Sequence, residues 1–228
     1  MRRDERPLRF VSATTWLILA VFLVVQIAWR ANQASTAPVA ADLPPAPPVA
    51  ALRLASFGEE ATTSRLTMLY LQAYPHRDLD YRRLMAWLET VLGLDPRSDY
   101  PLFAAARIYA ENPDPARSRI ALEFVHRQFF ADPDHRWQWL AHAALLAKHR
   151  LKDLPLAREY AAAVARHARS PGVPLWARQM EVFILEDMGE LEAARIMLGG
   201  LLESGQVSDP GELRFLRHRL EELSRRGQ

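Results

Sequence analysis

The chain has 228 residues, half of them apolar, which is enough for one good-sized domain with appendages. It contains no cysteine, and this excludes disulfides, thiol nucleophiles and cysteine-ligated zinc or iron–sulfur sites. Five of the 29 basic residues but only two of the 27 acidic residues lie within residues 1–30. The rest of the chain is therefore close to neutral and has no electrostatic footprint for nucleic acid.

The first predicted element is a transmembrane helix over residues 10–30, preceded by a cytoplasmic tail over residues 1–9. The run from Phe10 to Trp29 carries no charge, and about 20 helical residues span a bilayer core of about 30 Å. Four arginines precede the run and only Arg30 follows it closely, so the positive-inside rule places the N-terminus in the cytoplasm. We expect a single-pass protein of the bacterial inner membrane with its C-terminal domain in the periplasm. A cleaved signal peptide is the alternative, since Ala-x-x-Ala patterns follow the run.

Residues 31–57 are predicted to form a Pro/Ala-rich linker. Its prolines lack amide donors and favour the extended polyproline II conformation. These prolines are Pro38, Pro44, Pro45, Pro47 and Pro48. We expect a semi-rigid stalk that holds the following domain off the membrane, with an ordinary low-complexity tether as the alternative.

Residues 58–228 are predicted to form one helical-repeat domain, because apolar spacing is helical almost throughout and no run alternates with the period of a strand. The first helix is predicted over residues 59–74. Its apolar stripe comprises Leu66, Leu69, Tyr70 and Ala73. The second helix is expected to be capped by Asp80 and to end near Gly93.

Further helices follow in pairs along the chain. The predicted pairs are residues 99–111 with 114–131, 133–150 with 153–169, and 174–188 with 190–204. A last helix over residues 209–226 reads as a cap that closes the end of the stack. Its inward residues are predicted to be Leu213, Leu216, Leu220 and Leu223.

Two registers indicate a repeat of these helix pairs. Prolines recur at spacings of 37, 38 and 39 residues, a period typical of paired-helix repeats. They are Pro96, Pro133, Pro171 and Pro210. An Ala-Arg dipeptide also recurs near the start of each second helix, where a small residue allows close approach and the arginine is expected to reach solvent or a neighbouring carboxylate. These dipeptides are Ala116-Arg117, Ala157-Arg158 and Ala194-Arg195.

The order of an early aromatic, a small residue and a closing proline resembles the tetratricopeptide family over roughly residues 96–210. The three sets are Tyr100, Ala116 and Pro133; Trp137, Ala157 and Pro171; and Trp176, Ala194 and Pro210. The resemblance implies an all-α fold, a right-handed αα-superhelix whose groove binds a protein or peptide. The period here is longer than the family's usual one, so a related αα-superhelix outside the family stays open.

Three histidines on one predicted helix are the most conspicuous candidate ligands. His135, His142 and His149 are seven residues apart, so neighbours share a helix face but lie about 10 Å apart, too far for one metal ion. No metal or cofactor is predicted. Trp137 and Trp139 point about 200° apart on a helix, so one of them is a candidate for exposure. The predicted protein-binding residues are His135, Trp139, His142 and Trp176.

Acidic residues cluster around Gly189, where a paired-carboxylate hydrolase is conceivable. They are Glu186, Asp187, Glu190 and Glu192. A helix–turn–helix corner, in which acids favour the N-terminus of the following helix, explains them more simply. No phosphate loop, nucleophile elbow or zinc-protease motif is present in the sequence.

Three functional hypotheses follow. The leading one is a non-enzymatic, membrane-anchored scaffold or assembly factor that binds a protein or peptide in the cell envelope. The second is a structural accessory subunit of a larger membrane complex. The third is an envelope hydrolase that acts on cell-wall polymer.

Overall fold

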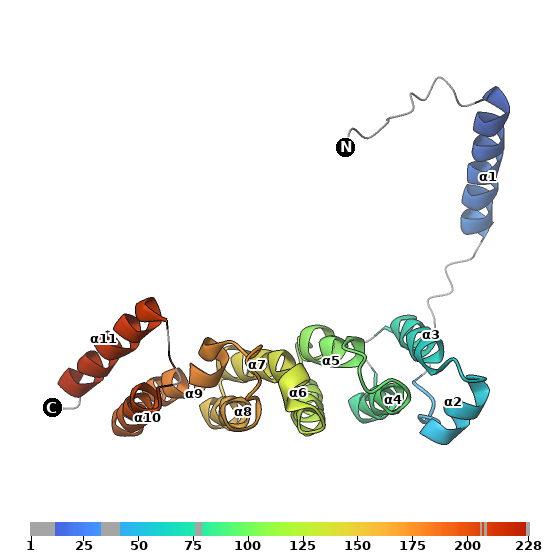
Figure 1. Cartoon of the computed structure of the whole chain (residues 1–228). Helices are drawn as coiled ribbons and strands as arrows, with labels where there is room; N and C mark the ends of the chain where they lie inside the picture. Colours follow the sequence, from blue (N-terminus) through green and yellow to red (C-terminus); the bar gives the residue numbers. More distant parts are fainter. Residues whose placement is uncertain (1–11, 33–41, 76–78, 206, 208, 227–228) are drawn as a thin grey trace. The chain divides into compact units, whose positions relative to one another are not determined.

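The computed structural model describes residues 12–32, 42–75, 79–205, 207 and 209–226. The chain divides into two compact units, Met1–Ala41 and Asp42–Gln228. Within the described residues, every regular element is a helix, so the all-α prediction is confirmed (Figure 1).

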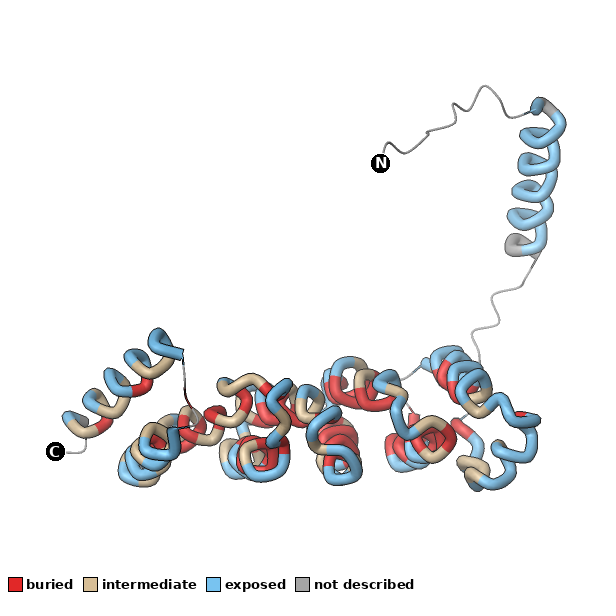
Figure 2. Tube along the Cα trace, in the orientation of Figure 1, coloured by how far each residue is buried: buried red, intermediate tan, exposed pale blue. Residues whose placement is uncertain are grey.

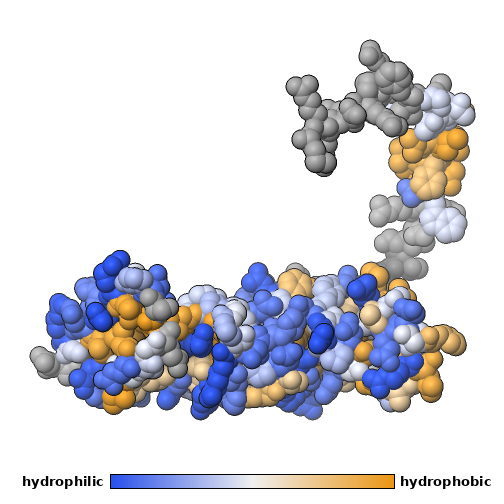
Figure 3. Space-filling model, viewed as in Figure 1, coloured by the Kyte–Doolittle hydropathy of each residue, from blue (hydrophilic) through white to orange (hydrophobic). Residues whose placement is uncertain are grey.

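The first unit contains one described helix, α1 (Ala13–Asn32). The apolar side chains described along α1 are exposed on all sides of the helix (Figures 2 and 3). A search of the described residues found no helix with the length and apolar character needed to cross a membrane. The segment predicted to span the membrane starts at Phe10, and residues 10 and 11 lie outside the described residues.

The second unit contains the predicted helix pairs. Its elements are α2 (Val49–Ala55), α3 (Glu60–Gln72), α4 (Tyr81–Leu94), α5 (Tyr100–Ala104), the π-helix η2 (Ala105–Tyr109), α6 (Pro115–Phe129), α7 (Pro133–His149), α8 (Leu154–His167), α9 (Leu175–Asp187), α10 (Leu191–Glu203) and α11 (Pro210–Arg226). The helices predicted beyond residue 58 are all present, with ends that differ by only a few residues. The helix predicted over residues 99–111 is α-helical only in its first half, α5, and its second half is the π-helix η2.

Helices pack against their neighbours in chain order, and alternate helices also meet. Contacts join α5 to α7 and α7 to α9, so these three helices share one face of the unit. Most buried apolar residues form one continuous core from Leu43 to Ile184. A smaller core lies between α9, α10 and α11 and includes Leu185, Leu198 and Leu216. Because α9 contributes to both cores, it joins the last helices to the rest of the stack.

The predicted cap of the second helix is confirmed, and two further aspartates cap helices in the same way. The Asp80 side chain accepts hydrogen bonds from the amides of Arg82 and Arg83 and so caps α4. Asp114 and Asp153 cap α6 and α8 in the same way. On α11, Leu216 and Leu223 are buried, with Leu213 and Leu220 packed beside them, as the predicted cap requires.

The Ala-Arg register matches the structure at most of its positions. Ala157 and Ala194 are fully buried where the paired helices approach, whereas Ala116 is exposed. The arginine of each dipeptide contacts a carboxylate. The three pairs are Arg117 with Asp114, Arg158 with Glu181, and Arg195 with Glu192.

The linker predicted over residues 31–57 differs from the structure from residue 42 onward. Leu43 is fully buried in the main core, and the Trp87 indole donates a 2.8 Å hydrogen bond to the Pro44 carbonyl. Prolines lack an amide donor but keep the carbonyl acceptor. The proline-rich segment from residue 42 is therefore held against α4 through a backbone carbonyl. Helix α2 then follows and packs on α4. The stretch from Asp42 belongs to the folded unit, while residues 33–41 lie outside the described residues.

Helix α3 exposes the stripe that its apolar spacing suggested would be buried. Leu66 and Leu69 are each about 60% exposed, whereas Met68 and Leu71 pack in the core. Helix α3 packs mainly on α4, and only one face of α3 turns toward that helix. Leu66 and Leu69 thus lie largely exposed, whereas Tyr70 of the same stripe contacts the Trp87 ring of α4 with centroids 5.6 Å apart.

Helix α4 ends at Leu94, one residue beyond Gly93, as predicted, and Gly93 has a further role in packing. A Cβ atom built on Gly93 would lie 2.6 Å from Cγ2 of Val49. The Gly93 carbonyl also accepts a 3.1 Å hydrogen bond from Nη2 of Arg53. Gly93 is thus the point where α2 crosses closely over α4.

We predict that Gly93→Ala lowers the free energy of unfolding by about 1–2 kcal/mol, because the added methyl group overlaps Val49 and displaces α2. A Cβ at Gly200, in α10, would meet nothing within 4 Å. Gly200→Ala is the matched control and should stabilise the chain by about 0.5–1 kcal/mol through helix propensity. Chemical denaturation of both variants measures the difference. Equal stability of the two would contradict the assigned role of Gly93.

The turns that contain the repeating prolines are held by side chains of α7. Arg136, 4% exposed, donates to the carbonyl of Pro96 at 2.8 Å and to that of Gln128 at 2.6 Å. The Asp134 carboxylate accepts from the amides of Arg169 and Ser170 at 2.7 and 2.8 Å, just before Pro171. Helix α7 thereby holds the turn before α5, the end of α6 and the turn before α9.

Candidate binding groove

The face shared by α5, η2, α7 and α9 carries a groove. Its volume is about 390 Å³, and its walls are largely aromatic. The lining residues are Phe103, Arg107, Trp137, Gln138, Trp139, Ala141, His142, Leu145 and Trp176. We call this set of residues the aromatic groove.

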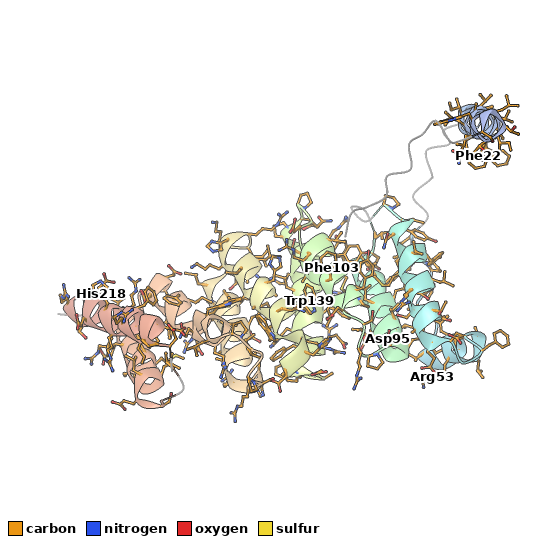
Figure 4. The ribbon with its side chains drawn as sticks, turned by 45° about the horizontal axis from the view of Figure 1, so that its top comes forward. Phe22, Arg53, Asp95, Phe103, Trp139 and His218 are labelled. Carbon is orange, nitrogen blue, oxygen red and sulfur yellow. The ribbon has the colours of Figure 1, made fainter. Side chains whose placement is uncertain are left out.

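The two tryptophans of α7 lean toward different neighbouring helices. Trp139 meets Phe103 of α5 edge to face, with ring centroids 5.7 Å apart (Figure 4). Trp137 meets Trp176 of α9 in the same geometry at 5.6 Å. Their predicted 200° separation places them on opposite sides of α7, yet each is half-buried and both line the groove. Trp176 itself is 52% exposed.

A polar contact fixes one side of the groove. Asp99 is the residue before α5, but its side chain makes no cap hydrogen bond. Instead its Oδ1 lies 3.2 Å from Nε2 of His135 and accepts a 3.4 Å hydrogen bond from the Trp139 indole. Asp99 therefore orients Trp139 by tying α7 to the start of α5.

The π-helix η2 places a cation at the rim of the groove. The hydrogen bond from the Ala110 amide to the carbonyl of Ala105, five residues earlier, is the one that defines a π-helix. Arg107 of η2 is exposed and directs Nη1 toward Nδ1 of His142 at 3.4 Å. Because a guanidinium only donates, Nδ1 of His142 accepts, and the neutral ring carries its proton on Nε2.

Burial lowers the pKa of His142, and the positive charge of Arg107 lowers it further, against the opposing effect of Glu111. The ring is therefore neutral at pH 7. Its Nε2 atom is buried and has no hydrogen-bond partner in the described part of the chain. The groove thus offers an apolar surface with an exposed guanidinium beside it.

Three of the four predicted binding residues come together in the groove, namely Trp139, His142 and Trp176. His135 does not line it and acts through Asp99 instead. Sequence reasoning did not single out Arg107. The position of its guanidinium depends on η2, and nothing in the residue pattern distinguishes that π-helix from an ordinary helix turn.

The acidic cluster around Gly189 is an ion-paired corner between helices. Gly189 has φ of 79° in the turn between α9 and α10, as a helix–turn–helix corner requires. Glu186 pairs with Arg219 of α11, and Asp187 pairs with Lys148 of α7. These contacts give both carboxylates a structural role.

Comparison of the chain with family models, curated proteins and solved structures found no match.

Proposed function

We propose that this chain is a membrane-anchored helical-repeat scaffold or assembly factor that binds a protein or peptide partner in the aromatic groove. The partner-binding unit is proposed to be a tetratricopeptide-like, right-handed αα-superhelix. The domain is proposed to lie in the bacterial periplasm, tethered to the inner membrane by residues 10–30.

The observation that carries the proposal is the aromatic groove. Tryptophan and arginine dominate the energy of protein interfaces, where a few large anchors fill pockets. Here three tryptophans and Arg107 surround one concave surface, and Trp176 is half exposed without a partner chain. Burying such a surface against an apolar segment would contribute roughly 25 cal/mol for each Å² of apolar area removed from water.

The anchor is supported by the uncharged run from Phe10 to Trp29 and by the exposure of every apolar side chain described along α1. The four arginines that precede the run support an N-terminus in the cytoplasm. The proposed anchor is the whole segment 10–30, which extends beyond the described helix.

An alkaline phosphatase reporter fused after Gln228 tests the topology. The phosphatase is expected to be active, since it folds only outside the cytoplasm, and a fluorescent cytoplasmic reporter at the same position should be dark. An inactive phosphatase with a bright fluorescent reporter would place the domain in the cytoplasm and contradict the proposal.

A structural subunit of a larger membrane complex is the second candidate, favoured by the uncovered apolar face of α3 around Leu66 and Leu69. Extraction of the full chain in mild detergent, followed by affinity purification and quantitative mass spectrometry, separates the two. A scaffold is expected to bring down partners below equal stoichiometry. Companions at equal stoichiometry that resist salt and stay bound to Trp176→Ala would identify a structural subunit.

A further inference from the structure

The aromatic groove contains a guanidinium that no carboxylate neutralises. Among the described residues, none of the ion pairs involves Arg107, and its hydrogen-bond contact is the neutral ring of His142. Arg158 and Arg219 elsewhere in the stack pair with Glu181 and Glu186. Arg107 differs from these two because it lines the apolar groove and makes no ion pair among the described residues.

Several carboxylates lie around the groove. Asp99 contacts His135 and the Trp139 indole, and Asp187 pairs with Lys148. Glu111 lies close enough to affect His142, yet it makes no ion pair with Arg107 among the described residues. The guanidinium of Arg107 thus lines the aromatic groove without a carboxylate ion pair in the described part of the chain.

The walls determine what could pair with this charge. Phe103, Trp139 and Leu145 lie beside Arg107 and would exclude water once an apolar side chain fills the groove. In such an environment an ion pair is stronger than in bulk water, and a guanidinium binds a carboxylate through two parallel hydrogen bonds.

We infer that the partner of the aromatic groove is an acidic peptide segment, in which a carboxylate binds Arg107 and an adjacent apolar side chain packs against Trp139. This inference rests on the proposed function and specifies its ligand chemistry. The carboxylate comes either from an Asp or Glu side chain or from a chain terminus.

Fluorescein-labelled eight-residue peptides test the inference against the full chain in detergent micelles, with fluorescence anisotropy as the readout. The first peptide is Gly-Ser-Leu-Leu-Asp-Leu-Ser-Gly with an amidated C-terminus. The second replaces its Asp by Asn, and the third combines that Asn with a free C-terminal carboxylate. Comparison of the first two peptides reports on a side-chain carboxylate, and comparison of the last two reports on a terminal one.

At least one carboxylate peptide is expected to bind about tenfold more tightly than the amidated Asn peptide, the gain typical of a charge-assisted pair. In Arg107→Gln this preference should disappear while the weak binding of the Asn peptide persists. Arg82→Ala, which removes an exposed arginine outside the groove, should keep the preference.

Equal binding of acidic and neutral peptides would overturn the inference, as would a preference that survives in Arg107→Gln. Absence of binding by all three peptides would overturn it as well. In each of these three cases, photocrosslinking at Trp176 still decides whether the groove binds a protein. Failure of the inference and failure of the proposed function are therefore distinguishable.

Discussion

Replacing Arg136 by alanine is expected to lower the free energy of unfolding by about 2–4 kcal/mol, because a lost hydrogen bond to a charged group costs about 1.5–3 kcal/mol and the cavity adds to that loss. The side chain is almost fully buried and satisfies two carbonyls, one in the turn before α5 and one near the end of α6. Burial lowers the pKa of the Arg136 guanidinium, and the carboxylates of Asp132 and Asp99 oppose that shift. Alanine would remove the side-chain donor of the Pro96 carbonyl and leave a cavity beside it, while the Gln128 carbonyl keeps the amide of Ala131 as a donor at 3.3 Å.

Two variants give this prediction its control. Arg136→Lys keeps the charge but cannot bind two separated carbonyls with a planar fork, so an intermediate loss is expected. Arg82→Ala makes the same change at an exposed position of α4 and should alter stability by no more than about 0.5 kcal/mol. Urea denaturation of the three variants provides the comparison. A loss in Arg136→Ala as small as that in Arg82→Ala would show that the buried hydrogen bonds do not hold the turn.

Trp176→Ala is expected to weaken binding of the partner by about 30-fold or more, the effect of removing a central interface anchor worth 2 kcal/mol. The side chain is 52% exposed and contacts Trp137 with centroids 5.6 Å apart. Its removal should therefore cost little folding stability while it removes one wall of the groove. Affinity for the protein that copurifies with the full chain is the measurement.

Phe130→Ala is the matched control, because Phe130 is 48% exposed but lies beyond α6, against His167. We expect less than a twofold change in affinity for this variant. Equal losses for Phe130→Ala and Trp176→Ala would indicate that the effect arises from general destabilisation of the stack.

The helix pairs could be predicted because local signals agree with the packing. Asp80, Asp114 and Asp153 occupy cap positions, and apolar spacing continues between them. Compositional bias misled the prediction at residues 42–57. A proline-rich strand can still be tied to a helix through its carbonyls, and the Trp87 donor lies more than 40 residues away in the sequence.

Long-range contacts explain the other differences. Asp99 has the sequence position of a cap, but His135 and Trp139 of α7 compete for its carboxylate. The sequence places Gly93 near the end of a helix, but its close contact with Val49 of α2 becomes evident only in the folded structure. The predicted binding residues Trp139, His142 and Trp176 share the groove because their helices repeat in register, whereas Arg107 depends on a local π-helix that periodicity does not reveal.

Photocrosslinking in cells tests the central claim most directly. The full chain would carry p-benzoylphenylalanine at Trp176 or, as the control, at Phe130, with adducts identified by mass spectrometry. The proposal predicts a discrete partner adduct from position 176 that is lost when Trp139→Ala is added, and no such adduct from position 130. Absence of an adduct at 176, or the same adduct from both positions, would contradict the assignment of the aromatic groove as the binding site.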